Sequence, residues 1–274
     1  MSFETAFAVT PSSSGFLGTV GEEWMFAGRV FGGCVAAFAS EVARATSPHL
    51  VLGSIQGSYP RAASPGPIEG RVEVIRKGRS TELLRIELLQ GDELVFTADA
   101  WMVDTRLVPA DQTVAGAEPP ASAPLVTWLE DEVAFFKNLE VRAIDYPLTP
   151  AGLGDGVPRC EVWVRGRPDL IGEATHGAAV DLLLFDAFLL ECVFRSEGVG
   201  TVQPITLDLG VRWTRHLPIH AWRRLTTEAT LTEGIALAGG TTRTADDTLL
   251  SRATTLGRLL RRADTEVEGG PRPV

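Results

Sequence analysis

The order of predicted elements repeats in the two halves of this chain, and this repeat restricts the possible folds more than any other feature. Ile68 precedes Trp222 by 154 residues, and Leu94 precedes Leu249 by 155 residues. These positions belong to two pairs of strand-like segments. A nearly constant offset across separate strands indicates an internal duplication.

Each half contains one apolar helix. In the segment 30–46, the residues Phe31, Val35, Phe38 and Val42 recur at helical spacing. Most other positions are alanine, which favours helix and lets a sheet pack closely around it. The second half carries a strongly apolar segment at 176–195, which we predict to be the matching helix.

Alternating apolar and polar residues predict strands that have one solvent-exposed face. Short breaks at 77–79 and 90–92 predict antiparallel hairpins. The predicted strands cover residues 3–10, 49–61, 68–77, 81–90, 93–103, 139–146, 159–165, 201–217, 222–231, 235–244 and 249–260. A short helix is expected around 126–136.

These elements predict an α+β fold built from two similar units. In each unit an antiparallel sheet would wrap its own helix, and the two sheets would join edge to edge, which removes two exposed edges. The predicted units are residues 1–105 and 136–262. A linker rich in Pro, Ala and Asp spans 106–135, and a flexible tail spans 263–274.

The composition excludes several classes of protein. The net charge is -10, which argues against nucleic acid as a partner. The three cysteines lie far apart, and His, Cys and acidic residues show no metal-ligand spacing. No segment has the form of a signal peptide or approaches ~20 apolar residues, so we predict no membrane span and a cytoplasmic protein.

Two segments resemble the type II acyl-CoA thioesterases. One is Phe31-Gly32-Gly33, which opens the first helix, and the other is Thr206–Trp213. The resemblance covers about residues 24–260. It implies a tandem, or double, hotdog fold, an acyl-CoA substrate hydrolysed by an activated water, and no cofactor beyond the coenzyme A of the substrate. It also implies a homo-oligomer, a dimer or larger.

The family's water-activating residues are an Asp, a Ser or Thr, and a Gln of the second unit. By position the resemblance implies Asp208 for the acid and Thr230 for the hydroxyl, although an alternative alignment places Ala229 there. The Gln position is occupied by Thr255. A Thr has a shorter reach and one donor fewer than a Gln, so the chain departs from the family pattern.

The backbone at Gly32 and Gly33 is the predicted oxyanion-binding element. Unpaired N–H groups and the helix dipole at a helix start favour negative charge, and glycine permits close approach of a substrate. Arg79 and Ser80, at the start of a hairpin, are the predicted contacts to coenzyme A phosphates.

Two other functions fit the sequence. A non-catalytic acyl-CoA or acyl-chain binding protein would explain the missing Gln. A dehydratase or hydratase would use His176 with Asp181 or Asp186. Asp181, Asp186 and Glu191 are five residues apart and therefore point to three different sides of the second helix, so they do not form a paired-carboxylate site. The resemblance to hotdog thioesterases, some of which use an acid of this helix, implies that one of them contacts the cleft.

Overall fold

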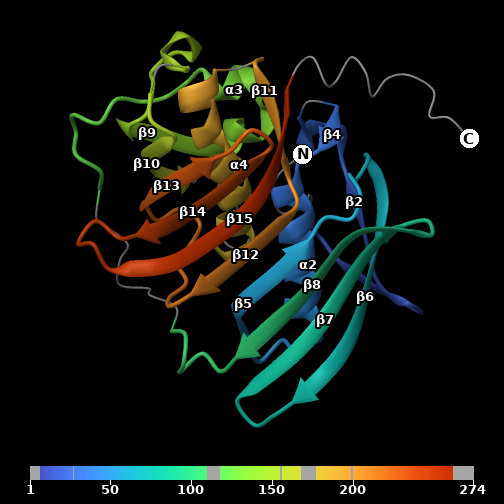
Figure 1. The fold of residues 1–274 in the computed structure, drawn as a ribbon. Helices are drawn as coiled ribbons and strands as arrows, with labels where there is room; N and C mark the ends of the chain where they lie inside the picture. Colours follow the sequence, from blue (N-terminus) through green and yellow to red (C-terminus); the bar gives the residue numbers. More distant parts are fainter. Residues whose placement is uncertain are drawn as a thin grey trace, which may run out of the picture.

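The structure is a computed structural model, and it describes residues 7–26, 28–109, 118–154, 156–167, 177–198 and 200–261. One antiparallel sheet runs through the molecule, and two long helices lie against it (Figure 1). The strands of the first half are β1 (Thr10–Ser12), β2 (Gly15–Val20), β3 (Met25–Phe26), β4 (Arg29–Val30), β5 (Val51–Ser58), β6 (Gly66–Lys77), β7 (Thr81–Gln90) and β8 (Glu93–Val103). Those of the second half are β9 (Leu139–Asp145), β10 (Arg159–Gly166), β11 (Val202–Thr206), β12 (Asp208–Trp213), β13 (Arg223–Leu231), β14 (Ile235–Arg243) and β15 (Leu249–Arg261).

The strand order of the main sheet is β1-β2-β6-β7-β8-β5-β12-β15-β14-β13-β10-β9. Counted outward from the middle of the sheet, the strands of the two halves follow the same order. Strand β5 corresponds to β12, β8 to β15, β7 to β14 and β6 to β13. The two halves meet where β5 pairs antiparallel with β12, from Ser58 opposite Asp208 to Ser54 opposite Arg212. The predicted duplication and the edge-to-edge junction are therefore confirmed.

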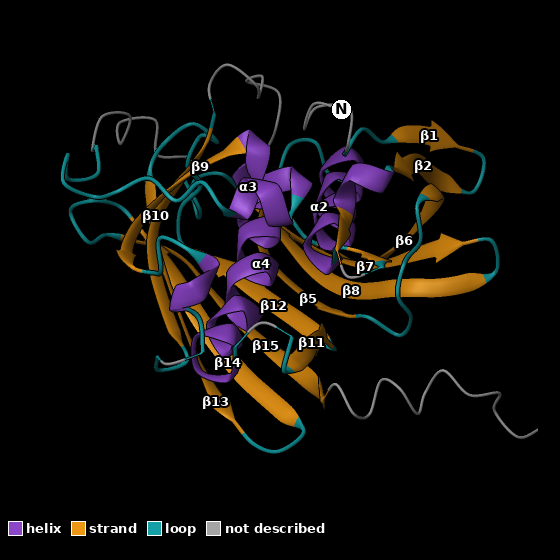
Figure 2. Ribbon diagram, turned by 90° about the horizontal axis from the view of Figure 1, so that it is seen from above, coloured by secondary structure: helices purple, strands orange, loops and turns teal. Residues whose placement is uncertain are grey.

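Helices α2 (Gly32–Thr46) and α4 (Gly177–Glu197) lie on the same side of the sheet and pack against each other (Figure 2). Gly33 permits this close packing, because a Cβ atom there would lie 2.8 Å from the Cα of Leu183. The buried positions of both helices are mostly apolar, and they form one hydrophobic core with the inner face of the sheet. The fold is the predicted tandem hotdog of the α+β class.

Most predicted elements agree with the structure, and β7 and β8 have the predicted bounds. Three predictions need correction. The N-terminal strand predicted at 3–10 is not found in its described part, residues 7–10, apart from Thr10. The first strands are instead β1 and β2, and residues 3–6 lie outside the described part. The predicted strand 201–217 is divided at Leu207. The helix predicted at 126–136 is a short α3 (Leu129–Glu132) followed by a 3-10 turn, Ala134–Asn138.

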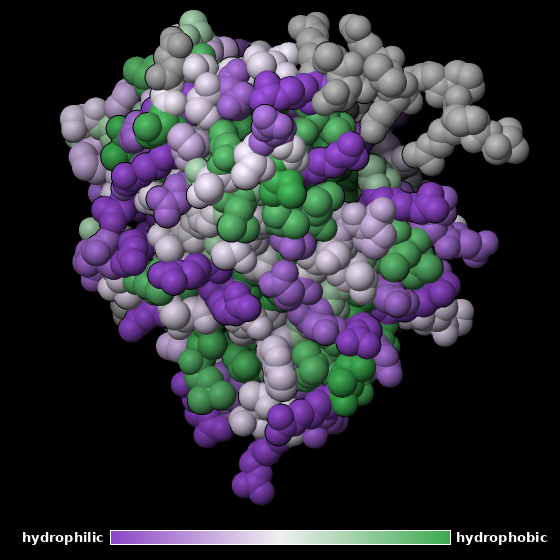
Figure 3. Space-filling view, viewed as in Figure 1, coloured by the Kyte–Doolittle hydropathy of each residue, from purple (hydrophilic) through white to green (hydrophobic). Residues whose placement is uncertain are grey.

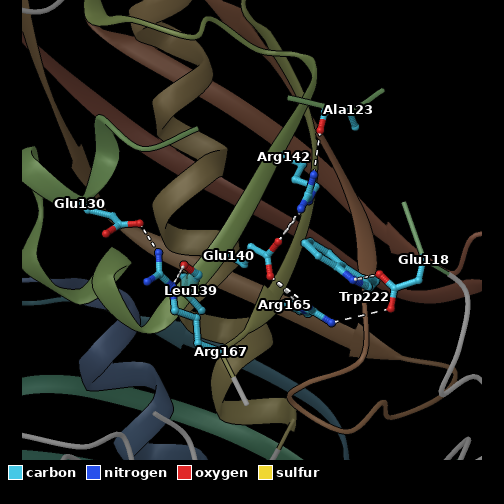
Figure 4. Close-up of polar contacts among 9 residues, drawn as sticks. All are labelled: Glu118, Ala123, Glu130, Leu139, Glu140, Arg142, Arg165, Arg167 and Trp222. Carbon is cyan, nitrogen blue, oxygen red and sulfur yellow. Dashed lines mark hydrogen bonds and ion pairs between the residues drawn. The ribbon is translucent and has the colours of Figure 1, made fainter. Parts of the chain in front are cut away.

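Residues 118–123 of the predicted linker are docked on the face of the second sheet opposite the core, whereas Val126, Leu129 and Phe135 belong to the core. Trp222 donates its Nε1–H to Glu118 at 2.9 Å, and Arg142 donates to the carbonyl of Ala123 at 3.1 Å (Figure 4). The guanidinium of Arg165 lies 4.4 Å from the centre of the Trp222 ring. These contacts fix the path of the chain between the two units.

Candidate functional site

A cavity of about 520 Å³ lies where the two units meet, at the start of α2 and along one side of α4. Its walls come from the β3–β4 hairpin, the segment after β5, the turn after α3 and strand β11. Phe26 and Leu207 line the cavity and are also partly exposed. On the face drawn in Figure 3, hydrophobic side chains gather among polar ones over β11 and the neighbouring end of β15.

Asp186 is an acidic residue that lines this cavity close to the start of α2. It is a buried residue of α4, and its Oδ2 accepts a hydrogen bond from the backbone N–H of Gly33 at 2.7 Å. Its Oδ1 accepts a hydrogen bond from the hydroxyl of Thr206 at 2.8 Å. Burial raises the pKa of Asp186 to about 6, against the lowering effect of these two hydrogen bonds. The carboxylate is therefore ionised at neutral pH and basic enough to take a proton from water.

The start of α2 supplies backbone donors next to this carboxylate. The N–H of Gly33 donates to Asp186, and the N–H of Cys34 donates to the carbonyl of Phe31. The N–H of Gly32 has no acceptor among the described residues. Gly32 lines the cavity, and a Cβ atom there would lie 3.1 Å from Oδ2 of Asp186. The predicted glycine pair is thus at the site, with Gly32 as the available donor.

Tyr59 is the third polar group at this point. Its hydroxyl donates to the carbonyl of Gly32 at 3.1 Å, and its ring packs 4.8 Å from that of Phe96. Burial raises the pKa of Tyr59 well above its usual value, and the charges of Asp186 and Asp208 raise it further. The phenol therefore stays protonated and remains a hydrogen-bond donor.

Glu191 is a second acid on the cavity wall, deeper along α4. Its Oε1 accepts the hydroxyl of Tyr146 at 2.9 Å. Burial raises the pKa of Glu191 to about 7, although this hydrogen bond lowers it. The resemblance implied that one of Asp181, Asp186 and Glu191 contacts the cleft, and two of them, Asp186 and Glu191, line the cavity.

Asp208 lies near the cavity but is not part of its wall. Its carboxylate accepts the backbone N–H of Leu256 at 2.9 Å, and its carbonyl accepts the hydroxyl of Thr255 at 2.5 Å. Thr206 pairs with Gly257, whereas Gly210 pairs with Thr254, so β11 and β12 contain one residue more than β15 opposite them. This bulge lets Thr206 face α4 and turns Asp208 away from it.

Thr230 does not join Asp208 and Thr255. Strands β14 and β15 separate it from the strand of Asp208, which is a distance of ~14 Å at the usual strand spacing. Thr230 is exposed, whereas Ala229 packs against the core and is aligned through Ala238 with the buried Thr255. The register thus favours the alternative alignment, in which the family's hydroxyl position is an alanine.

Arg79 and Ser80 lie in the turn between β6 and β7, at the lower end of the hairpin in Figure 1. The twelve residues of β6 separate this turn from the cavity wall at Ala63, about 40 Å at the usual strand rise. The structure does not bring them to the cavity. Arginines at its exposed edge are Arg29, Arg61 and Arg258, which sequence reasoning missed because they lie on three separate elements.

Of the residues proposed for a dehydratase, the structure describes only Asp181 and Asp186. His176 lies outside the described residues. Asp181 is buried in an ion pair with Arg223 and accepts the indole N–H of Trp213 at 2.8 Å. In the described part of the chain, no three His, Cys, Asp or Glu side chains are grouped in a way that could hold a metal ion. No described helix is long and apolar enough to cross a membrane.

Residues 20–103 match the family model of the acyl-CoA thioesterase N-terminal domain. The matched residues lie in the first unit, which is therefore similar to the N-terminal domain of acyl-CoA thioesterases. The resemblance predicted from Phe31-Gly32-Gly33 is thereby confirmed. The matched segment contains Gly32, Gly33 and Tyr59, while Asp186, Thr206 and Asp208 come from the second unit.

Solved structures share the whole double hotdog arrangement. A conserved hot dog fold protein from Alicyclobacillus acidocaldarius superposes with a TM-score of 0.77 at 21% identity, covering 94% of this chain and 97% of its own. The acyl-CoA thioesterase II TesB2 of Mycobacterium marinum gives a TM-score of 0.70 at 21% identity, covering 94% and 98%. The tesB protein of Mycobacterium avium subs paratuberculosis gives 0.71 at 18% identity, covering 93% and 96%. No curated protein matches the sequence.

Proposed function

We propose that this protein hydrolyses acyl-CoA thioesters in the cavity at the start of α2. The observation that carries the proposal is the position of Asp186, a buried and ionised carboxylate beside Gly32, whose N–H has no acceptor among the residues described. A base and an oxyanion donor are the two groups that thioester hydrolysis requires. The first unit supplies the donor, and the second unit supplies the base.

In the proposed reaction, Asp186 takes a proton from a water as the water oxygen attacks the thioester carbonyl. Each carboxylate oxygen already accepts one hydrogen bond, and each has a further lone pair for the water. The carbon–sulfur bond then breaks, and the proton held by Asp186 passes to the leaving thiolate. The products are the free acid and coenzyme A, and no cofactor or metal takes part.

The negative charge on the carbonyl oxygen would develop at the N-terminus of α2. The N–H of Gly32 and the positive end of the helix dipole favour that charge. Tyr59 stays protonated and holds the carbonyl of Gly32, which keeps the first turn of the helix in place. Arg29, Arg61 and Arg258 at the edge of the cavity are suited to the phosphates of coenzyme A.

Asp208 is the second candidate base, because the type II pattern implies it and because it lies close to Tyr59. Its carboxylate is held by Leu256 and lies off the cavity wall, so the geometry favours Asp186.

We also propose that the protein forms a homo-oligomer and is located in the cytoplasm. The exposed Ile235 and Leu237 on β14 are apolar residues that association would bury.

The test is a free-thiol release assay with acyl-CoAs from acetyl to palmitoyl. We expect release by the wild type, a loss of about 100-fold or more in Asp186→Asn, and a smaller loss in Asp208→Asn. The opposite order would assign the base to Asp208. No release with any substrate, together with a raised melting temperature in acyl-CoA, would support the acyl-CoA binding protein instead.

A further inference from the structure

The cavity wall contains a second carboxylate, which the proposed hydrolysis does not use. Glu191 lies on the α4 face that lines the cavity, together with Ala187, Leu190 and Phe194. These four residues follow helical spacing, so they form one continuous stripe. Glu191 is five residues beyond Asp186, which places it about 7.5 Å further along the helix axis.

The position of Glu191 is fixed by its neighbour. Tyr146 is buried, and its ring stacks on Trp128 with a centroid distance of 5.9 Å and meets Phe188 edge-on at 5.9 Å. The hydroxyl of Tyr146 donates to Oε1 of Glu191 at 2.9 Å. This leaves Oε2 with no partner among the described residues, on the wall of the cavity.

Several side chains that line the cavity with Glu191 are apolar. Leu190, Phe194 and Phe136 are buried and line the cavity. A saturated acyl chain placed there would remove Oε2 from water and return no hydrogen bond, which is unfavourable. An acyl chain that carries a hydroxyl group would donate to Oε2 and avoid this loss. A charged ammonium group would lose its hydration among the same apolar side chains.

We propose that Glu191 is a specificity-determining residue and that the preferred substrates are hydroxyacyl thioesters. Their hydroxyl group would lie several carbons beyond the thioester, at the distance that separates Glu191 from Asp186. The inference rests on the proposed function for the identity of the reacting group. Recognition of the hydroxyl itself depends only on the cavity, so binding can be measured apart from hydrolysis.

The experiment compares octanoyl-CoA with its monohydroxy derivatives, from mid-chain to the terminal carbon, in the thiol-release assay. We expect kcat/KM for at least one hydroxy derivative to exceed that for octanoyl-CoA by on the order of 10- to 100-fold. Glu191→Leu should abolish this preference, because the free acceptor is gone. Glu197→Gln, on the same helix but off the cavity wall, should retain it.

Calorimetric binding of octanoic acid and its hydroxy derivatives separates this proposal from the proposed function. If no thioester is hydrolysed but a hydroxy acid binds more tightly to the wild type than to Glu191→Leu, the hydrolytic function fails and the hydroxyl recognition holds. Equal affinity for hydroxylated and plain acids in the wild type would overturn the recognition. A preference that persists in a folded Glu191→Leu variant would also overturn it. Glu191→Gln, with its nearly equal volume, checks that any change comes from chemistry rather than from packing.

Discussion

The two units have the same strand order, but their helices are used differently. Gly32 and Gly177 both begin a helix and are 145 residues apart, and the same offset relates Glu41 to Asp186. Asp186 reaches the backbone of the opposite helix at Gly33, whereas Glu41 forms an ion pair at 2.8 Å within its own helix, with Arg44.

The two helix starts differ as well. Gly32 lines the cavity, and its N–H has no acceptor in the part of the chain that the structure describes. Gly177 packs against the backbone, since a Cβ atom there would lie 2.1 Å from the carbonyl oxygen of Leu217. The duplication therefore repeats the order of helices and strands. A few side chains, and the exposure of the start of α2 to the cavity, determine which unit contributes which part of the site.

The largest effect is expected from exchanging the acids of the two helices for amides. Asp186→Asn should lower kcat for thioester hydrolysis by about 100-fold or more, because the base is lost while the shape is kept. Glu41→Gln should leave kcat within a few-fold of the wild type. Thiol release under saturating substrate measures both. Equal losses in the two variants would show that the helices are not functionally distinct.

The helix starts provide the next comparison. Gly32→Ala should lower kcat/KM by roughly 10- to 100-fold, because the new methyl group occupies the space beside Asp186 and Tyr59 and displaces the substrate. Gly177→Ala should instead lower the melting temperature, because the backbone at Leu217 must move. Kinetics and thermal unfolding of both variants check this. A Gly32→Ala variant with wild-type kinetics would remove Gly32 from the site.

Glu191 should make the free energy of unfolding depend on pH. Its pKa is raised from 4.5 to about 7 in the folded protein, so the folded state binds more protons, and stability falls as the pH rises through this range. Glu191→Gln lacks this loss and should be more stable than the wild type above pH 7, by up to about 3 kcal/mol. Urea unfolding at several pH values measures the difference. A difference that does not change with pH would contradict a Glu191 that titrates with a raised pKa.

The smallest effect is a change of rate with pH in the wild type. Asp186 must be ionised to accept a proton, and its pKa is about 6. The value of kcat/KM should therefore rise with pH, with a midpoint near 6, and should fall about tenfold for each pH unit below it. A flat profile from pH 5 to pH 8 would exclude a base with this pKa.

The fold was predictable because its signals are local. Helical spacing at Phe31, Val35 and Phe38, the alternation along β7 and β8, and the short breaks between strands each depend on neighbouring residues. The junction of the sheets followed from the repeat and from the need to cover open edges. The division at Leu207 was missed, because a single inserted residue leaves no mark in an apolar pattern.

The site was less predictable because it depends on which face of the sheet each side chain lies on and on contacts between residues far apart in the sequence. A strand position that differs by one residue faces the other side of the sheet, which decides between Thr230 and Ala229. The bulge at Leu207 has the same effect on Asp208. The role of Asp186 depends on where α4 passes the start of α2, and helix periodicity gives no information on that crossing.

The most direct test of the proposed site, the cavity at the start of α2 where the two units meet, is a crystal structure with a bound acyl-CoA analogue. The analogue has a methylene group between the carbonyl and the sulfur and is therefore not hydrolysed. We predict that the carbonyl oxygen accepts a hydrogen bond from the N–H of Gly32. The carboxylate of Asp186 should lie within hydrogen-bond reach of a water that faces the carbonyl carbon. A carbonyl bound beside Asp208 and Thr255, with Asp186 covered by the acyl chain, would contradict the assignment.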